Sequence, residues 1–262
     1  MQGRQRLESL DYIRQRKGPI DVHQRTRRRR TRPPAPESLL RTFPVWDPHV
    51  RWSHALITVL FAWQFLSGQF GLGPGWLHLW AGYALLVVVL FRIGWGLVGS
   101  DSARFSRMLP TPAELAAYLP RLFSRQASHW PGHNPVGAVS ALLLLTLLLL
   151  QSVTGLFVET WGELRGPLAE QVGRGTAIWM NDLHDLLRWP LFALVAIHLI
   201  AVFAYWLIKK ENRIGPMFGS GRIALPSDPG LARAAGGKAW LVWLIALLTV
   251  TGLVWLGPRV PV

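Results

Sequence analysis

The 262-residue sequence contains no cysteine and few charged residues. The lack of cysteine excludes disulfides, thiolate-bound zinc, iron–sulfur clusters and haem attached covalently through a Cys-x-x-Cys-His motif. A redox cofactor in this chain would therefore be held without a covalent bond, by histidine or methionine. Charged residues make up only 16% of the chain and apolar residues 50%, which is the profile of a polytopic membrane protein rather than of a soluble domain with one core.

Acidic residues are also scarce, with 14 Asp and Glu against 28 Lys and Arg, and the formal net charge is +14. Half of this excess lies in residues 1–40, which include a run of four arginines at 27–30 among prolines. We predict that residues 1–42 form a basic, disordered cytoplasmic arm, which either lies against anionic lipid or results from an overextended start site. This placement of the charge argues against nucleic acid as a partner.

Five apolar runs are long enough to cross a bilayer as helices. They span about 50–68, 76–98, 135–158, 183–208 and 239–257. A shorter helix is expected at 111–119, and the lead-in at 42–48, which contains two prolines, is expected to be extended. We predict an all-α integral membrane protein, with a four-helix transmembrane bundle over 43–218, followed by a linker and a fifth C-terminal transmembrane helix over 219–262.

Positive charge predicts the orientation of these spans. Lys and Arg gather in the N-terminal arm and in the second-to-third and fourth-to-fifth connections, whereas the other two connections are nearly free of them. By the positive-inside rule, the N-terminus lies inside and the C-terminus outside.

The fourth run carries two histidines, His184 and His198, which are 14 residues apart. At 100° per residue this spacing falls 40° short of four turns, so both rings project from nearly the same helix face, about 21 Å apart along the axis. Ionisable side chains inside a membrane helix call for a functional explanation. Two of them at different depths on one face are suited to holding two cofactors.

Two further histidines fall at matching depths. His78 lies near the outer start of the second run, at the level of His184, and His54 lies near the inner start of the first run, at the level of His198. Facing neutral imidazoles suit the axial positions of a low-spin haem iron. The remaining histidines, His23, His49, His129 and His133, belong to polar segments and are assigned no role.

Three other residues are candidates for cofactor contact. Gly82, four residues after His78, would let a macrocycle approach or would serve ordinary helix packing. Arg92 shares the face of His78 at the inner level, and Arg51 lies one turn before His54. Each arginine either pairs with a haem propionate or extends to the inner membrane surface as a positive-inside residue.

Three segments resemble the bacterial di-haem cytochrome b561 family, which includes the b-type cytochrome subunits of nickel-iron hydrogenases. They read VWDPHVRWSHALI, WLHLWAGYALLVVVLFRIGWGLVGS and LHDLLRWPLFALVAIH. The resemblance covers about 44–218. It implies that His54, His78, His184 and His198 are the axial ligands of two non-covalent haems b, and that the chain is a multi-pass protein of the bacterial inner membrane.

We therefore expect a membrane electron carrier whose two haems pass electrons between an outer-face redox partner and the quinone pool, rather than a self-contained enzyme. The partner would be a hydrogenase-type enzyme, a molybdenum enzyme or a small cytochrome c. One alternative is a stand-alone quinone-linked oxidoreductase acting on a small oxidant such as superoxide. This enzyme would need a basic funnel at the outer haem, where only Arg165, Arg174 and Arg188 are basic. The other alternative is a haem-free membrane scaffold or transporter.

Overall fold

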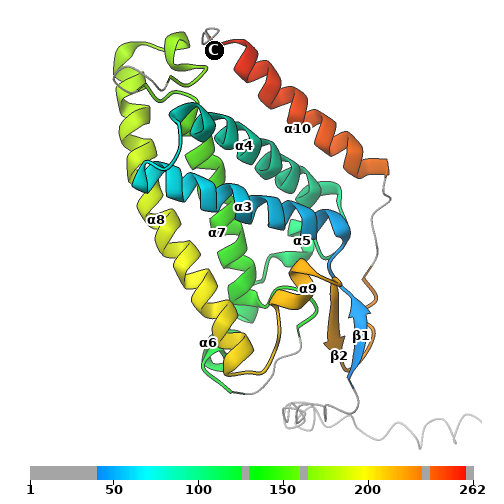
Figure 1. The fold of residues 1–262 in the computed structure, drawn as a ribbon. Helices are drawn as coiled ribbons and strands as arrows, with labels where there is room; N and C mark the ends of the chain where they lie inside the picture. Colours follow the sequence, from blue (N-terminus) through cyan, green and yellow to red (C-terminus); the bar gives the residue numbers. More distant parts are fainter. Residues whose placement is uncertain (1–39, 126–129, 160–164, 232–236, 258–262) are drawn as a thin grey trace, which may run out of the picture. The chain divides into compact units, whose positions relative to one another are not determined.

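Helices make up most of the described chain (Figure 1). The computed structural model describes residues 40–125, 130–159, 165–231 and 237–257, so the predicted basic arm lies almost wholly outside the described residues. The long helices are α3 (Pro48–Phe70), α4 (Gly75–Val98), α7 (Pro135–Gly155), α8 (Arg174–Leu207) and α10 (Gly237–Trp255). The short ones are α5 (Phe105–Met108), α6 (Pro112–Leu122), the 3-10 helix η2 (Ala169–Gln171) and α9 (Ile214–Phe218).

Within the described ranges, four helices are long and apolar enough to cross a membrane. They are α4, α7, α8 and α10, with mean hydropathies of 1.9, 2.2, 2.1 and 1.7. They correspond to the second through fifth predicted spans, which confirms a multi-pass membrane protein. The helix of the first predicted span, α3, has 23 residues but is not one of the four, because polar side chains such as Arg51, His54 and Gln64 lower its hydropathy.

The helix α8 is longer than its apolar run. It was predicted over about 183–208, but it begins at Arg174 and has 34 residues, or about 51 Å at 1.5 Å per residue. The sequence between Gly175 and Pro190 contains no glycine or proline, so the polar stretch before the apolar run continues the same helix. The predicted short helix is confirmed as α6, whose N-cap Thr111 forms a capping box with Glu114.

A small sheet makes the described chain mostly rather than wholly helical. The strands β1 (Arg41–Pro44) and β2 (Arg222–Leu225) pair antiparallel, with Arg41 opposite Leu225. The lead-in was predicted to be extended, but its partner lies some 180 residues away, and no local pattern indicates that pairing. The sheet ties the start of the predicted bundle to the segment predicted as a linker.

Four helices surround a shared apolar core. Neighbours in contact are α3 with α4, α4 with α7, and α7 with α8. Leu85 and Val89 of α4 pack with Leu148 of α7 and Leu191 of α8. Phe192 of α8 completes the circuit, because its ring centroid lies 4.7 Å from that of Phe65 on α3.

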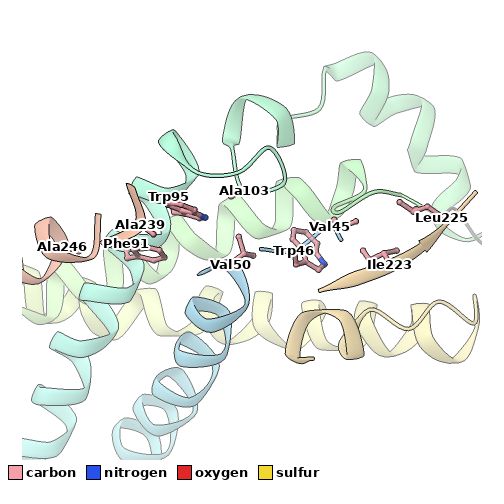
Figure 2. Close-up of a cluster of buried hydrophobic side chains, with 10 residues drawn as sticks. All are labelled: Val45, Trp46, Val50, Phe91, Trp95, Ala103, Ile223, Leu225, Ala239 and Ala246. Atoms are coloured by element: carbon pink, nitrogen blue, oxygen red, sulfur yellow. The ribbon is translucent and has the colours of Figure 1, made fainter. Parts of the chain in front are cut away.

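The fifth long helix, α10, packs against α4. Trp243 stacks on Phe91 with ring centroids 3.9 Å apart and planes 7° from parallel. Figure 2 shows the buried cluster at this contact, which also takes in Trp95 and the start of α3. The side of α10 away from α4 is apolar and exposed, as at Ile245 and Leu248, which suits contact with lipid.

Asp47 fixes the start of α3 against the end of α4. One carboxylate oxygen accepts a hydrogen bond from the backbone N–H of Val50 at 2.9 Å, which caps the helix. The other oxygen accepts from Trp95 Nε1 at 3.0 Å and from the hydroxyl of Ser100. The N-terminal end of α3 and the C-terminal end of α4 are therefore held together on the predicted inner side.

Candidate functional site

The structure brings two of the four singled-out histidines to one cavity. His78 of α4 and His184 of α8 both line a cavity of about 300 Å³, as does Gly82. Two further glycines, Gly68 of α3 and Gly155 of α7, lie in its wall. The cavity is therefore enclosed by all four bundle helices, at the end of the bundle predicted to lie outside.

His78 is held by α3. The Oγ of Ser67 lies 2.8 Å from Nδ1 of His78, and the same hydroxyl donates to the carbonyl of Trp63 at 2.7 Å. Because its single hydrogen is used there, the hydroxyl accepts from Nδ1–H of His78. The side-chain amide of Gln64 also donates to the backbone carbonyl of His78 at 2.8 Å.

His184 is held in the same manner by α7. Its Nδ1 lies 3.0 Å from the carbonyl oxygen of Gln151 and 3.1 Å from the hydroxyl of Thr154. A carbonyl oxygen can only accept, so Nδ1 of His184 carries the hydrogen. In both rings this tautomer leaves the lone pair on Nε2, the atom available to bind a metal.

The other two histidines form a second group. His54 interacts electrostatically with His198 and Arg92. Helix α8 carries both His184 and His198 without interruption, so their axial separation is the predicted 21 Å or so. Leu148 and Leu191 belong both to the lining of the outer cavity and to the apolar core around which the four helices pack.

His133, which the sequence analysis left without a role, lies near this inner group. Burial is the main cause that lowers the pKa of His133 to about 3. Nearby groups that lower the pKa further are Arg92, His198, His54 and Arg213. Pro131 and Gly132 form a turn before α7, and this turn places the ring of His133 4.9 Å from that of Trp46, just before α3. No helical spacing indicates that position.

Three arginines hold buried nitrogens that have no hydrogen-bond partner among the described residues. These atoms are Nε of Arg51, Nη1 of Arg92 and Nε of Arg188. The first two are the predicted propionate partners on the inner side. Arg188 lines the outer cavity, and sequence reasoning noted it only as a basic residue on the outer face. Arg188 lies four residues after His184 and so shares its helix face, and this spacing could have identified it from the sequence.

These features fit a haem at each level. No group of three or more His, Cys, Asp or Glu residues that could hold a metal occurs in the described ranges. A haem iron needs only two protein ligands, because the porphyrin supplies the others. Unpaired buried guanidinium nitrogens suit carboxylates. Gly82 faces α3, where an added Cβ would lie at an ordinary contact distance of 3.5 Å from Nε2 of Gln64.

The described basic residues near the outer end are largely paired. Arg165 forms ion pairs with both Glu159 and Glu170. Arg188 lies 3.5 Å from a carboxylate oxygen of Asp185. These pairs neutralise much of the positive charge that the sequence places there.

Comparison with known proteins identifies the family of the chain. The sequence profile of prokaryotic cytochrome b561 matches residues 45–220. A probable Ni/Fe-hydrogenase B-type cytochrome subunit of Rhizobium leguminosarum bv. viciae is 25% identical over 56% of this chain and 67% of its own length. A protein with the same description from Azotobacter chroococcum mcd 1 is 25% identical over 58% and 69%, respectively. No solved structure matches the chain. Because the family profile covers about two thirds of the sequence, the chain belongs to the prokaryotic cytochrome b561 family.

Proposed function

We propose that this membrane b-type cytochrome carries electrons across the bilayer through two haems b, each bound by two histidines. The outer haem would lie between His78 and His184, and the inner haem between His54 and His198. Electrons would pass between a redox enzyme on the outer face and the quinone pool. The haem iron supplies the one-electron chemistry, and the chain supplies ligation, burial and charge.

The observation that carries this proposal is the state of the two outer imidazoles. His78 and His184 line one cavity from opposite sides of the bundle. Both donate Nδ1–H to a neighbouring helix, which leaves two Nε2 lone pairs for one iron. Two unrelated core histidines would have no reason to share both a cavity and a tautomer.

The proposal of an inner haem is supported by the charge and burial of nearby side chains. Nδ1 of His54, Nε of Arg51 and Nη1 of Arg92 are all buried without a hydrogen-bond partner in the described chain. Buried polar groups in native proteins are nearly always satisfied, so these atoms suit the acidic groups of a bound cofactor. Haem propionates near Arg51 and Arg92 would satisfy the two arginines.

A hydrogenase-type enzyme is the partner we favour, because the similar proteins are described as Ni/Fe-hydrogenase cytochrome subunits. Reaction with an anionic oxidant such as superoxide would require a basic funnel at the outer end. The pairing of Arg165 with two glutamates and of Arg188 with Asp185 removes much of that field.

Haem content after single histidine substitutions tests the proposal. We expect two haems per chain in the purified protein by pyridine haemochrome assay, and about one in either His184→Ala or His198→Ala. His49→Gln is the matched control, since His49 packs on Trp95 outside both groups, and it should keep both haems. A wild-type protein without haem, or a His198→Ala variant that retains two reducible haems, would refute the assignment.

Reduction by quinol separates a carrier from a stand-alone enzyme. In proteoliposomes, quinol should reduce both haems, and re-oxidation should require an added electron acceptor on the outer face, such as a soluble cytochrome c. Rapid re-oxidation by superoxide alone would favour the enzyme instead.

A further inference from the structure

The two sides of the outer cavity are built from two copies of one sequence pattern. Residues 64–70 read QFLSGQF and residues 151–157 read QSVTGLF, so both follow Gln-x-x-Ser/Thr-Gly-x-Phe. The first copy is at the end of α3 and the second spans the end of α7. Each copy therefore closes the helix that precedes a histidine-bearing helix.

Both copies make the same three contacts with a histidine. The glutamine amide donates to the histidine's backbone carbonyl, at 2.8 Å from Gln64 and 3.0 Å from Gln151. The hydroxyl meets Nδ1, at 2.8 Å from Ser67 and 3.1 Å from Thr154. The Cε1 atom of the ring also lies close to the glycine.

The glycines are required by the closeness of the rings. A Cβ added at Gly68 would lie 3.2 Å from Cε1 of His78, and one added at Gly155 would lie 3.1 Å from Cε1 of His184. Both distances are shorter than ordinary van der Waals contact, so a side chain at either position would push the ring away. Positions i, i+3 and i+4 share a helix face, which explains how three residues of one pattern reach one ring.

The hydroxyls of Ser67 and Thr154 can only accept hydrogen bonds from the histidines. Ser67 donates to Trp63 and Thr154 donates to Leu150, each to the carbonyl four residues earlier. Each oxygen is thus left to accept from an imidazole N–H. At the inner level the situation differs, because Nδ1 of His54 has no hydrogen-bond partner in the described chain.

We infer that Ser67 and Thr154 are equivalent positioning residues that accept Nδ1–H of His78 and His184, Thr154 together with the carbonyl oxygen of Gln151, and that they thereby hold the ring planes and lower the reduction potential of the outer haem. The inference rests on the proposed function. An imidazole that donates Nδ1–H becomes a more basic ligand, and a more basic ligand favours the ferric over the ferrous state.

Paired substitutions test this role. Ser67→Ala and Thr154→Val each remove one acceptor, and we expect both to raise the same one of the two haem potentials, measured by spectroelectrochemical titration. The low-spin ferric EPR signal of that haem should also shift, because the imidazole rings that bind it are no longer held in fixed planes. The double variant should shift the potential further and weaken binding of that haem by about tenfold or more.

The controls distinguish positioning from general helix stability. Thr146→Val removes a similar hydroxyl from α7, where Thr146 donates to the carbonyl of Leu142, and it should change neither potential. Ser67→Thr and Thr154→Ser retain the hydroxyl and should behave like the wild type. The inference is overturned if the two substitutions shift the potentials of different haems. It is also overturned if neither shifts a potential more than Thr146→Val does. Absence of two haems from the wild-type protein would instead overturn the proposed function.

Discussion

Arg188 is the cation closest in sequence to an outer ligand, one helical turn after His184. Its Nε is buried without a hydrogen-bond partner in the described residues, while another of its nitrogens pairs with Asp185. An arginine whose Nε has no other partner in the described residues can bind a carboxylate of the cofactor. Its positive charge would also stabilise the additional electron of a reduced haem.

Arg188→Gln should therefore lower the reduction potential of the outer haem and leave the inner one unchanged. The shift should be opposite in sign to that of Ser67→Ala. Potentiometric titration of the purified protein measures the reduction potentials of both haems in one experiment. Arg165→Gln is the matched control, because Arg165 is half-exposed and paired with two glutamates. An equal effect of the two substitutions would mean that only the general field of the outer face had changed.

His133 should make the stability of the fold depend on pH. Its pKa in the folded protein is about 3, against about 6.5 in an unfolded chain. The unfolded state alone therefore takes up a proton between these values, so stability is complete above pH 6.5 and falls as the pH decreases towards 3. The loss at pH 5 would be at most about 2 kcal/mol.

Thermal unfolding in detergent at pH 8 and pH 5 checks this effect. His133→Asn should reduce the difference between the two pH values, whatever it does to stability at pH 8. An unchanged pH dependence in this variant would show that other groups are responsible.

At the scale of elements, the close contact of α4 with α10 requires a glycine. A Cβ at Gly94 would lie 2.7 Å from Cγ1 of Val242. Gly94→Ala should destabilise the protein by about 1–3 kcal/mol through overpacking, and the added substitution Val242→Ala should restore it. The measurement is the midpoint of thermal unfolding.

Gly252→Ala on α10 serves as the control, since no atom lies within 4 Å of its added Cβ, and alanine is the better helix former. It should be neutral or slightly stabilising. If Gly94→Ala were equally harmless, α10 would pack less tightly on α4 than the structure indicates.

The helices were predictable because their apolar runs carry the signal over many residues, and α4, α7, α8 and α10 all begin and end near the expected positions except for the start of α8. The pairing of β1 with β2 was not predictable, because two four-residue strands so far apart have no periodicity to connect them. The role of Asp47 was similarly hidden, since its partners Trp95 and Ser100 lie in another helix and the loop after it.

At the scale of the whole molecule, the predicted orientation can be tested directly. The distribution of Lys and Arg places the N-terminus inside and the C-terminus outside. A reporter that is active only outside the inner membrane should be active when fused after residue 262, and inactive when fused after Lys210, in the fourth-to-fifth connection. The reverse pattern would exchange the terms inner and outer throughout the proposed electron path.

In the candidate site, the meeting of His78 and His184 at one cavity was predictable, and the contacts that support their rings were not. Four histidines could be paired by depth because helical spacing and the charge rule are both readable from the chain. The contacts of Ser67 and Thr154 were not found, although the repeated Gln-x-x-Ser/Thr-Gly pattern was a readable signal. His133 reaches the inner group through a turn, and turns position side chains by tertiary contacts rather than by period.

The twofold use of one pattern has a consequence for biogenesis. Each helical hairpin carries one proposed ligand of the outer haem, already oriented by its own neighbour, so the nascent chain presents two half-sites that need no refolding to accept a porphyrin. Insertion of the cofactor would then join the early-synthesised and late-synthesised halves, and a shortage of haem would leave them separable and open to membrane proteases.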